Sequence, residues 1–178
     1  MTSDRSQARL DALRARLAEL GVPLFRRRAA GPPLAQDEYV ELIGALFRSG
    51  DVRLRLAIPC LLAANDTSAA EVVRTAAAAL PKAGSVDLGL LYRLARCLVV
   101  SRAPLLAYRL GRSPALPPLP IEPAEVPDPA ELRGEKGLRV ASELFRERGL
   151  PDLPGGAERQ FDTWLDLVGN GSRRRESA

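Results

Sequence analysis

The 178-residue chain contains no histidine, and this absence excludes the commonest catalytic arrangements. Ser-His and Cys-His pairs need an imidazole base, and zinc sites built from histidine and cysteine need several such ligands close together. Cys60 and Cys97 stand far apart, each in an apolar run, as is typical of buried thiols in a reducing compartment. Neither GxxxxGK[ST] nor GxGxxG occurs. We therefore expect a protein that is not an enzyme and that uses no cofactor or metal.

Long apolar runs and aromatic residues are also scarce. No run approaches the roughly 20 apolar residues that span a bilayer, and the first residues lack the apolar region of a signal peptide. We expect a cytoplasmic protein. Aromatic residues make up only 4% of the chain, so the core must consist mainly of Leu, Val, Ile and Ala. That composition favours helices over strands.

Lysine is nearly absent: Lys82 and Lys136 are the only two, and arginine supplies the rest of the positive charge. Arginine binds carboxylates and phosphates through its planar fork, which suits an anionic partner. The alternative is GC-rich coding, which raises Arg, Ala, Pro and Gly together. The formal net charge of +4 is mild.

The spacing of apolar residues predicts an all-α protein: an irregular or HEAT-like helical bundle with a Pro-rich strap and a C-terminal helical pair. The segment 85–102 is apolar nearly all round, which is typical of a central helix. Leucines at 10, 13, 17 and 20 form a stripe that either docks on the core or dimerises as a coiled coil. The expected helices cover 3–20, 37–48, 51–65 with a bend near 58 at Pro59, 68–80, 85–102, a short segment from 104, 131–148 and 157–168.

Turn and capping residues set the expected helix ends. Ser68 and Glu71 form a capping-box pattern at the start of 68–80. Gly169 and Gly171 are expected to end the last helix. Residues 113–130 carry seven prolines and three acidic residues, which indicates an extended strap or, alternatively, a ligand for a Pro-binding domain. The expected domains are a helical core (1–112), a linker (113–130), C-terminal helices packing on the core (131–170) and a disordered basic tail (171–178).

A basic strip lies between Lys82 and Arg112, where Asp87 is the only acidic residue. Basic side chains beside Tyr92 and Tyr108 could hold nucleic acid. The alternative is internal neutralisation by the acids of the strap, Glu122, Glu125 and Asp128. The candidate anion-binding residues are Arg26, Arg27, Arg28, Arg93, Arg96 and Arg102.

The last helix offers two further candidates. Its apolar side chains could anchor a partner protein or pack back on the core, and the pair Asp162 and Asp166 could hold a divalent metal or simply face solvent. The acids Asp37, Glu38 and Glu41 cluster in the same way at another helix start. The candidate partner-binding residues are Phe161, Trp164, Leu165 and Val168.

The segment Gly50-Asp51-Val52-Arg53, followed by Ala57 and Leu61, resembles the second half of a HEAT-type helical repeat. The resemblance covers residues 37–64 best and 67–102 loosely. It implies that Asp51 caps a helix and that Arg53 bridges to a neighbouring repeat. The second helix pair lacks the Asp-Val-Arg signature, and an irregular bundle is the alternative.

These observations lead to a leading functional hypothesis and an alternative. The first is a non-catalytic bacterial interaction or regulatory module, such as an antitoxin-like or accessory subunit of a partner enzyme. The alternative is a nucleic-acid-binding accessory protein that uses the arginine-rich face. A carboxylate enzyme with a divalent metal is a third possibility.

Overall fold

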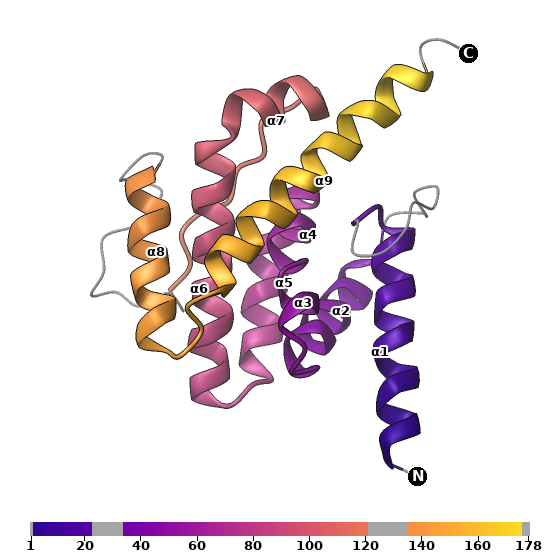
Figure 1. Ribbon diagram of the computed structural model, residues 1–178, viewed down its shortest axis with the longest axis vertical. Helices are drawn as coiled ribbons and strands as arrows, with labels where there is room; N and C mark the ends of the chain where they lie inside the picture. The colour runs from indigo at the N-terminus through magenta and orange to yellow at the C-terminus, as the bar shows by residue number, and fades with distance from the viewer. Residues whose placement is uncertain (1, 23–33, 121–134, 176–178) are drawn as a thin grey trace.

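The structure, a computed structural model, describes residues 2–22, 34–120 and 135–175. Every regular element in these ranges is an α-helix, which confirms the all-α fold class (Figure 1). Among these residues, no helix combines the length and apolarity needed to cross a lipid bilayer. The helices are α1 (Thr2–Glu19), α2 (Gln36–Arg48), α3 (Val52–Arg55), α4 (Ile58–Ala64), α5 (Asp66–Ala78), α6 (Lys82–Ser101), α7 (Ala103–Leu110), α8 (Glu135–Glu147) and α9 (Leu153–Arg175).

Helix α1 docks on the body of the chain through the C-terminal half of its leucine stripe. Leu17 is fully buried, and Val22 joins it just after the helix ends. Gly21 adopts a φ of 74°, and the Val22 N–H donates to the Leu17 carbonyl at 3.0 Å. This left-handed glycine turns the chain back so that an apolar residue covers the last turn. In this structure the leucine stripe of α1 therefore docks on the core.

The predicted bend at Pro59 is confirmed. Helix α3 ends at Arg55 and α4 begins at Ile58, with Pro59 in the first turn of α4. Proline has no N–H to donate, so the first turn of a new helix is where it costs least. The expected helix 51–65 is therefore divided into a short helix and a longer one.

Helices α2 to α6 form a stack of helical hairpins. Helix α2 packs chiefly against α5, and α4 packs chiefly against α6. Helix α6 is buried on all sides from Leu88 to Val99, as its apolar pattern predicts.

The predicted capping box at Ser68 is wrong. Helix α5 begins at Asp66, and the Ser68 N–H already donates to the Asn65 carbonyl at 3.3 Å, inside the first turn. Glu71 accepts instead from Arg74 and from the Thr75 hydroxyl. The turn residues before Ser68 are as compatible with a helix start as Ser68 itself, so the sequence pattern alone does not choose among them.

The C-terminal pair α8 and α9 closes over the stack. Helix α8 packs on α6, while α9 crosses α4 and α7 (Figure 1). The predicted end of the last helix at Val168 is wrong, because α9 runs through Gly169 and Gly171 to Arg175. An interior glycine costs a helix about 1 kcal/mol and does not by itself end it. At the other end, Gly156 permits close packing, since a Cβ there would lie 3.1 Å from the Leu56 side chain.

Candidate interaction surfaces

The predicted basic strip on α6 is not a surface. Arg93 is 4% exposed and Arg96 is 7% exposed. The Arg96 Nε donates to the Leu116 carbonyl at 2.9 Å, so the start of the Pro-rich segment lies against this arginine. The helical period correctly places both arginines near one face of α6. It does not reveal that another part of the chain covers that face.

Residues 112–117, which we call the strap, are held at both ends. At one end, Asp66 accepts from the Arg112 guanidinium and, at 2.9 Å, from the Ala115 N–H. At the other end, the Tyr92 hydroxyl donates to the Pro117 carbonyl at 2.8 Å. The expected intramolecular covering of α6 is thus present in the described part of the segment, and Glu122, Glu125 and Asp128 lie outside the described residues.

Arg102 is engaged with carboxylates of α9. Its Nε lies 2.8 Å from Asp162 Oδ1, and its Nη2 lies 2.7 Å from Glu158 Oε1. The hydrogen bond to Asp162, followed by the contact with Glu158, raises the pKa of the Arg102 guanidinium above its usual range. One turn further along α9, Asp166 Oδ1 lies 3.6 Å from Arg109 Nη2. We call these contacts the arginine ladder; it fastens α9 to the junction of α6 and α7.

The ladder also accounts for the acidic pair considered as a metal site. Asp162 and Asp166 lie one turn apart on one face of α9, and each is paired with an arginine. Among the described residues, no three potential metal ligands gather in one place. Glu38, another acidic candidate, accepts from the Ala35 N–H at the start of α2.

The proposed partner anchors of the last helix belong to the core. Phe161 and Leu165 are fully buried and Trp164 is 2% exposed, with the two aromatic rings 5.2 Å apart edge to face. Val168 is partly buried against the same core. Their spacing is that of a helix docked on α4 and α7, and in this structure these side chains pack on the core. Arg26, Arg27 and Arg28 lie outside the described residues.

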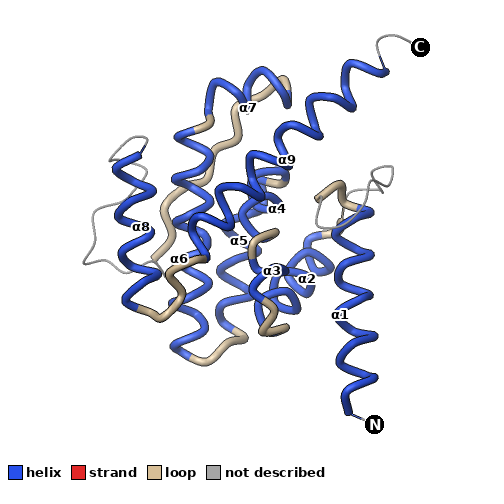
Figure 2. The backbone as a smooth tube through the Cα atoms, viewed as in Figure 1, coloured by secondary structure: helices blue, strands red, loops and turns tan. Residues whose placement is uncertain are grey.

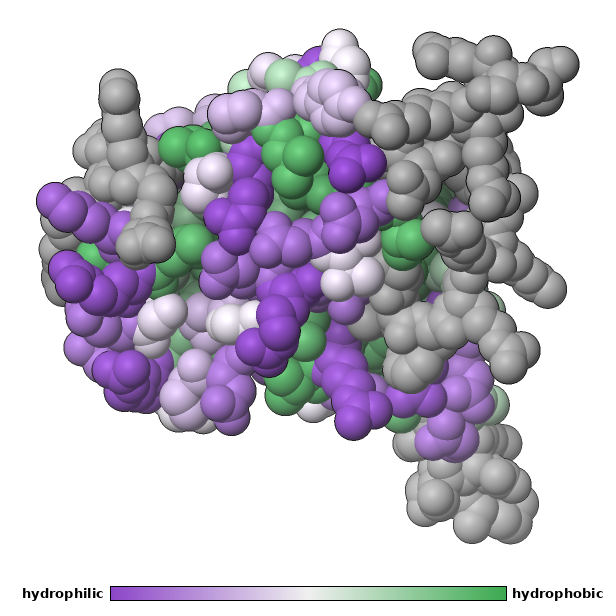
Figure 3. Space-filling model, turned by 45° about the horizontal axis from the view of Figure 1, so that its top comes forward, coloured by the Kyte–Doolittle hydropathy of each residue, from purple (hydrophilic) through white to green (hydrophobic). Residues whose placement is uncertain are grey.

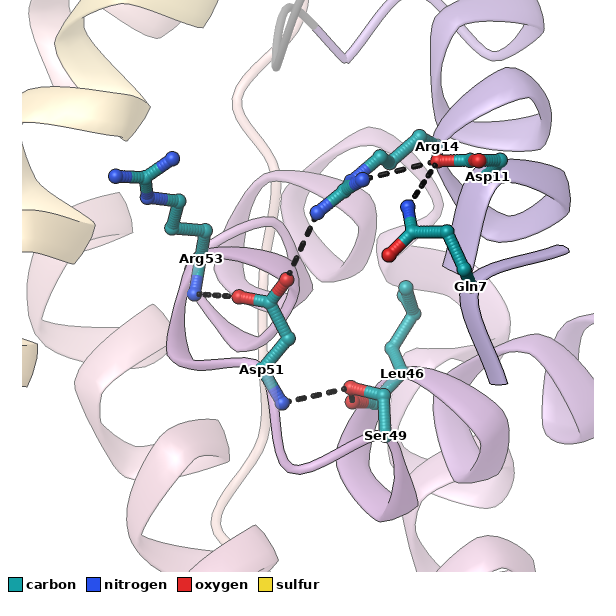
Figure 4. Close-up of polar contacts among 7 residues, drawn as sticks. All are labelled: Gln7, Asp11, Arg14, Leu46, Ser49, Asp51 and Arg53. Atoms are coloured by element: carbon teal, nitrogen blue, oxygen red, sulfur yellow. Dashed lines mark hydrogen bonds and ion pairs between the residues drawn. The ribbon is translucent and has the colours of Figure 1, made fainter. Parts of the chain in front are cut away.

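Asp51 has the capping role that the HEAT resemblance implies. Its Oδ1 accepts from the Arg53 N–H at 2.9 Å, while its Oδ2 lies 3.2 Å from Arg14 Nη2 on α1 (Figure 4). Arg14 also pairs with Asp11, and the Asp51 N–H donates to the Ser49 hydroxyl. The carboxylate therefore caps α3 and ties it to α1.

The structure shows no bridging contact for the Arg53 side chain among the described residues. The Arg53 side chain is exposed and points away from the Asp51 cluster (Figure 4). Arg55 instead stacks over the Phe47 ring, 4.7 Å from its centroid, and its Nε donates to the Phe47 carbonyl at 3.1 Å.

Two exposed large hydrophobic side chains lie on either side of the junction of α6 and α7. Among the residues whose exposure is described, the exposed large hydrophobic side chains are Val52, Val100 and Tyr108, and the last two border this junction. Tyr108 is 66% exposed and Val100 is 41% exposed. Pro104 and Ala107 are also exposed, and Pro104 and Tyr108 lie one turn apart on α7. We call these four residues the α7 face.

The face of the molecule drawn in Figure 3 is mixed in hydropathy. On this face, hydrophobic residues are interspersed with hydrophilic ones. Scattered single hydrophobic residues are ordinary on protein surfaces, whereas several at helical spacing on one element favour an interaction site. From the sequence, Tyr108 is predicted only as a stacking residue for nucleic acid, because an apolar period alone does not show which side chains are exposed.

The fold and these surfaces define a class: an all-helical hairpin stack, closed by a Pro-rich strap and a C-terminal helix pair. Comparison of the chain with protein-family models, with curated proteins and with solved structures finds no match.

Proposed function

We propose that this protein is a non-catalytic interaction module that binds another protein through the α7 face. The observation that carries the proposal is the pair of exposed large hydrophobic side chains, Val100 and Tyr108, bordering one helix junction. Tyrosine is among the residues that most often dominate binding energy at interfaces. A regulatory or accessory subunit of a partner enzyme would use such a face.

Helix α7, which carries most of the α7 face, is fixed by packing and by its C-terminal turn. Leu106 is fully buried beneath it, and Gly111, with a φ of 67°, ends α7 in the left-handed conformation. The arginine ladder then ties the same junction to α9. An interface on a supported helix loses less side-chain and backbone entropy on binding than one on a flexible loop.

The candidate arginines that the structure describes do not favour the nucleic-acid alternative. Arg93 and Arg96 are buried, and Arg102 is neutralised by Asp162 and Glu158. Phosphate binding needs positive side chains that reach the solvent and release counterions. The alternative nevertheless makes its own prediction, which the experiment below includes.

The test is affinity capture from a gently lysed native host, followed by a high-salt wash and mass spectrometry. Wild-type chain should retain one protein at near-stoichiometric amounts. Tyr108→Glu should lose it, because a charge would be buried in an apolar interface. Val52→Glu is the matched control, since Val52 is similarly exposed, at 42%, but lies on α3.

The outcomes separate the hypotheses. Retention of the same protein by Tyr108→Glu would overturn the α7 face as the binding site. Recovery of nucleic acid that the salt wash removes, with no stoichiometric protein, would favour the nucleic-acid alternative instead.

A further inference from the structure

The two arginines of the ladder are not equally satisfied. Arg102 donates hydrogen bonds to two carboxylates of α9, from Nε to Asp162 at 2.8 Å and from Nη2 to Glu158 at 2.7 Å. Arg109 meets a single carboxylate, that of Asp166, at 3.6 Å, which is longer than a hydrogen bond. The Arg109 Nε also has no hydrogen-bond partner among the described residues. The Arg109 guanidinium therefore keeps hydrogen-bonding capacity that the Arg102 guanidinium already uses.

The sequence of α9 explains this difference. Acidic residues recur every fourth position at 158, 162 and 166, so they share one face of the helix. The next position in the series is 170, where the sequence has Asn and not an acid. Helix α7 lies beside α9, so Arg109 can meet this series only near its end (Figure 2). Helix α9 thus supplies two carboxylates to Arg102 and one to Arg109.

Arg109 adjoins the exposed part of the α7 face. Its Cζ lies 5.9 Å from the centroid of the Tyr108 ring, which belongs to a residue that is 66% exposed. The Arg109 side chain is 20% exposed and that of Asp166 is 71% exposed, so their contact is open to solvent. A side chain that covers the Tyr108 ring therefore comes close to the guanidinium. Arginine binds carboxylates through charge-assisted hydrogen bonds, and tyrosine and arginine are the residue types that most often anchor interfaces.

We infer that Arg109 is a carboxylate-binding position of the α7 face, and that the protein segment bound there carries an Asp or Glu beside an apolar side chain. This inference rests on the proposed function and names the chemistry of its partner. The apolar side chain covers Tyr108, and the carboxylate pairs with Arg109. Asp166, which meets the same guanidinium from within the chain, competes with that carboxylate.

A purely structural role of the Arg109–Asp166 pair gives a different prediction. If the pair only holds α9, then Arg109→Met and Asp166→Asn break the same contact and change binding in the same direction. If Arg109 binds the carboxylate of a partner, Arg109→Met weakens binding, whereas Asp166→Asn strengthens it because a competitor is removed. The signs of the two effects therefore separate the roles.

The test selects short random peptides, displayed on phage, against the immobilised full-length protein. The selected peptides should contain an acidic residue beside an apolar one. Their binding should weaken about tenfold or more in Arg109→Met, because hydrogen bonds to charged groups are lost, and should tighten in Asp166→Asn. Arg74→Met is the matched control, since the Arg74 side chain is 62% exposed and lies on α5.

A double-mutant cycle identifies the group that Arg109 binds. Replacing the acid of a selected peptide by its amide should weaken binding to the wild-type chain and have little effect on binding to Arg109→Met. Additive effects of the two changes would show that the peptide carboxylate does not meet Arg109.

The remaining outcomes separate this inference from the proposed function. Peptides that require Tyr108 but are not enriched in acidic residues would overturn the carboxylate-binding position and leave the α7 face intact. Weaker binding to Asp166→Asn, matching that of Arg109→Met, would do the same. Peptides that bind Tyr108→Glu as tightly as wild type, or the selection of no peptide, would overturn the proposed function and, with it, this inference.

Discussion

The hairpin stack and the layer that closes it are held by different interactions. Within α2 to α6, most contacts are made by apolar side chains, and the central helix α6 is buried from Leu88 to Val99. The strap and α9 add polar fastenings: Tyr92 and Arg96 to the strap, and Arg102 and Arg109 to α9. Apolar packing is insensitive to salt, whereas partly exposed ion pairs are screened by it. The closing layer is thus the part of the molecule whose ion pairs added salt should weaken most.

The largest loss of stability is expected from a substitution in α9, the part of the closing layer that packs into the core. Trp164→Ala should lower the free energy of unfolding by about 3–5 kcal/mol, since it removes a large buried ring and leaves a cavity. Tyr108→Ala, on the exposed α7 face, should change it by less than about 0.5 kcal/mol. Chemical denaturation of both variants checks this. A small loss for Trp164→Ala would mean that α9 is not packed on the stack.

The next effect tests the arginine ladder. Arg102→Met should cost about 1–2 kcal/mol, because it removes the hydrogen bonds to Asp162 and Glu158 while keeping an apolar side chain of similar length. The side chain of Arg102 is 25% exposed and that of Asp162 is 44% exposed, so added salt should reduce the cost.

A double-mutant cycle with Asp162→Asn isolates the pairwise energy of that contact. Additive effects of the two substitutions at low salt would show that the ladder does not fasten α9.

The two buried tyrosines should respond in opposite directions. The Tyr39 hydroxyl is buried without a hydrogen-bond partner among the described residues, and burial raises the pKa of its phenol above the usual range. Tyr39→Phe should therefore stabilise the protein by about 1 kcal/mol. Tyr92→Phe should destabilise it by about 1 kcal/mol, because the donor to the Pro117 carbonyl is lost. Equal shifts in the thermal midpoint would contradict the assignment of Tyr92 as a strap contact.

The sequence predicts the helices of the stack well, and the reason is physical. Leucine, valine and alanine at helical spacing specify which face is buried, and Pro59 specifies where a helix must divide. The covering of a face is a tertiary property. The helical spacing that places Arg93 and Arg96 together is the same whether that face is exposed or lies under a strap. Likewise, the spacing of Phe161, Trp164 and Leu165 is the same for a helix docked on the core and for a helix that binds a partner.

Helix ends are predictable only where one signal outweighs its competitors. Asp51 is the sole capping residue next to α3, and its cap is present. Gly169 and Gly171 act as weak stops, and the helix continues through them. Such local preferences of about 1 kcal/mol are easily overridden by the remaining contacts of a long helix.

The smallest expected effect concerns a cap that the sequence suggested and the structure does not use. Ser68→Ala should change the free energy of unfolding by less than about 0.5 kcal/mol, since Ser68 lies inside the first turn of α5 and not at its N-cap. Asp51→Ala, at a true N-cap, should cost about 1 kcal/mol and loosen α1 as well, because Arg14 loses a partner. Urea denaturation of the two variants side by side makes the comparison. If Ser68→Ala cost as much as Asp51→Ala, the helix would start at Ser68, and the Asp66 carboxylate that holds the strap would belong to a turn and not to a helix.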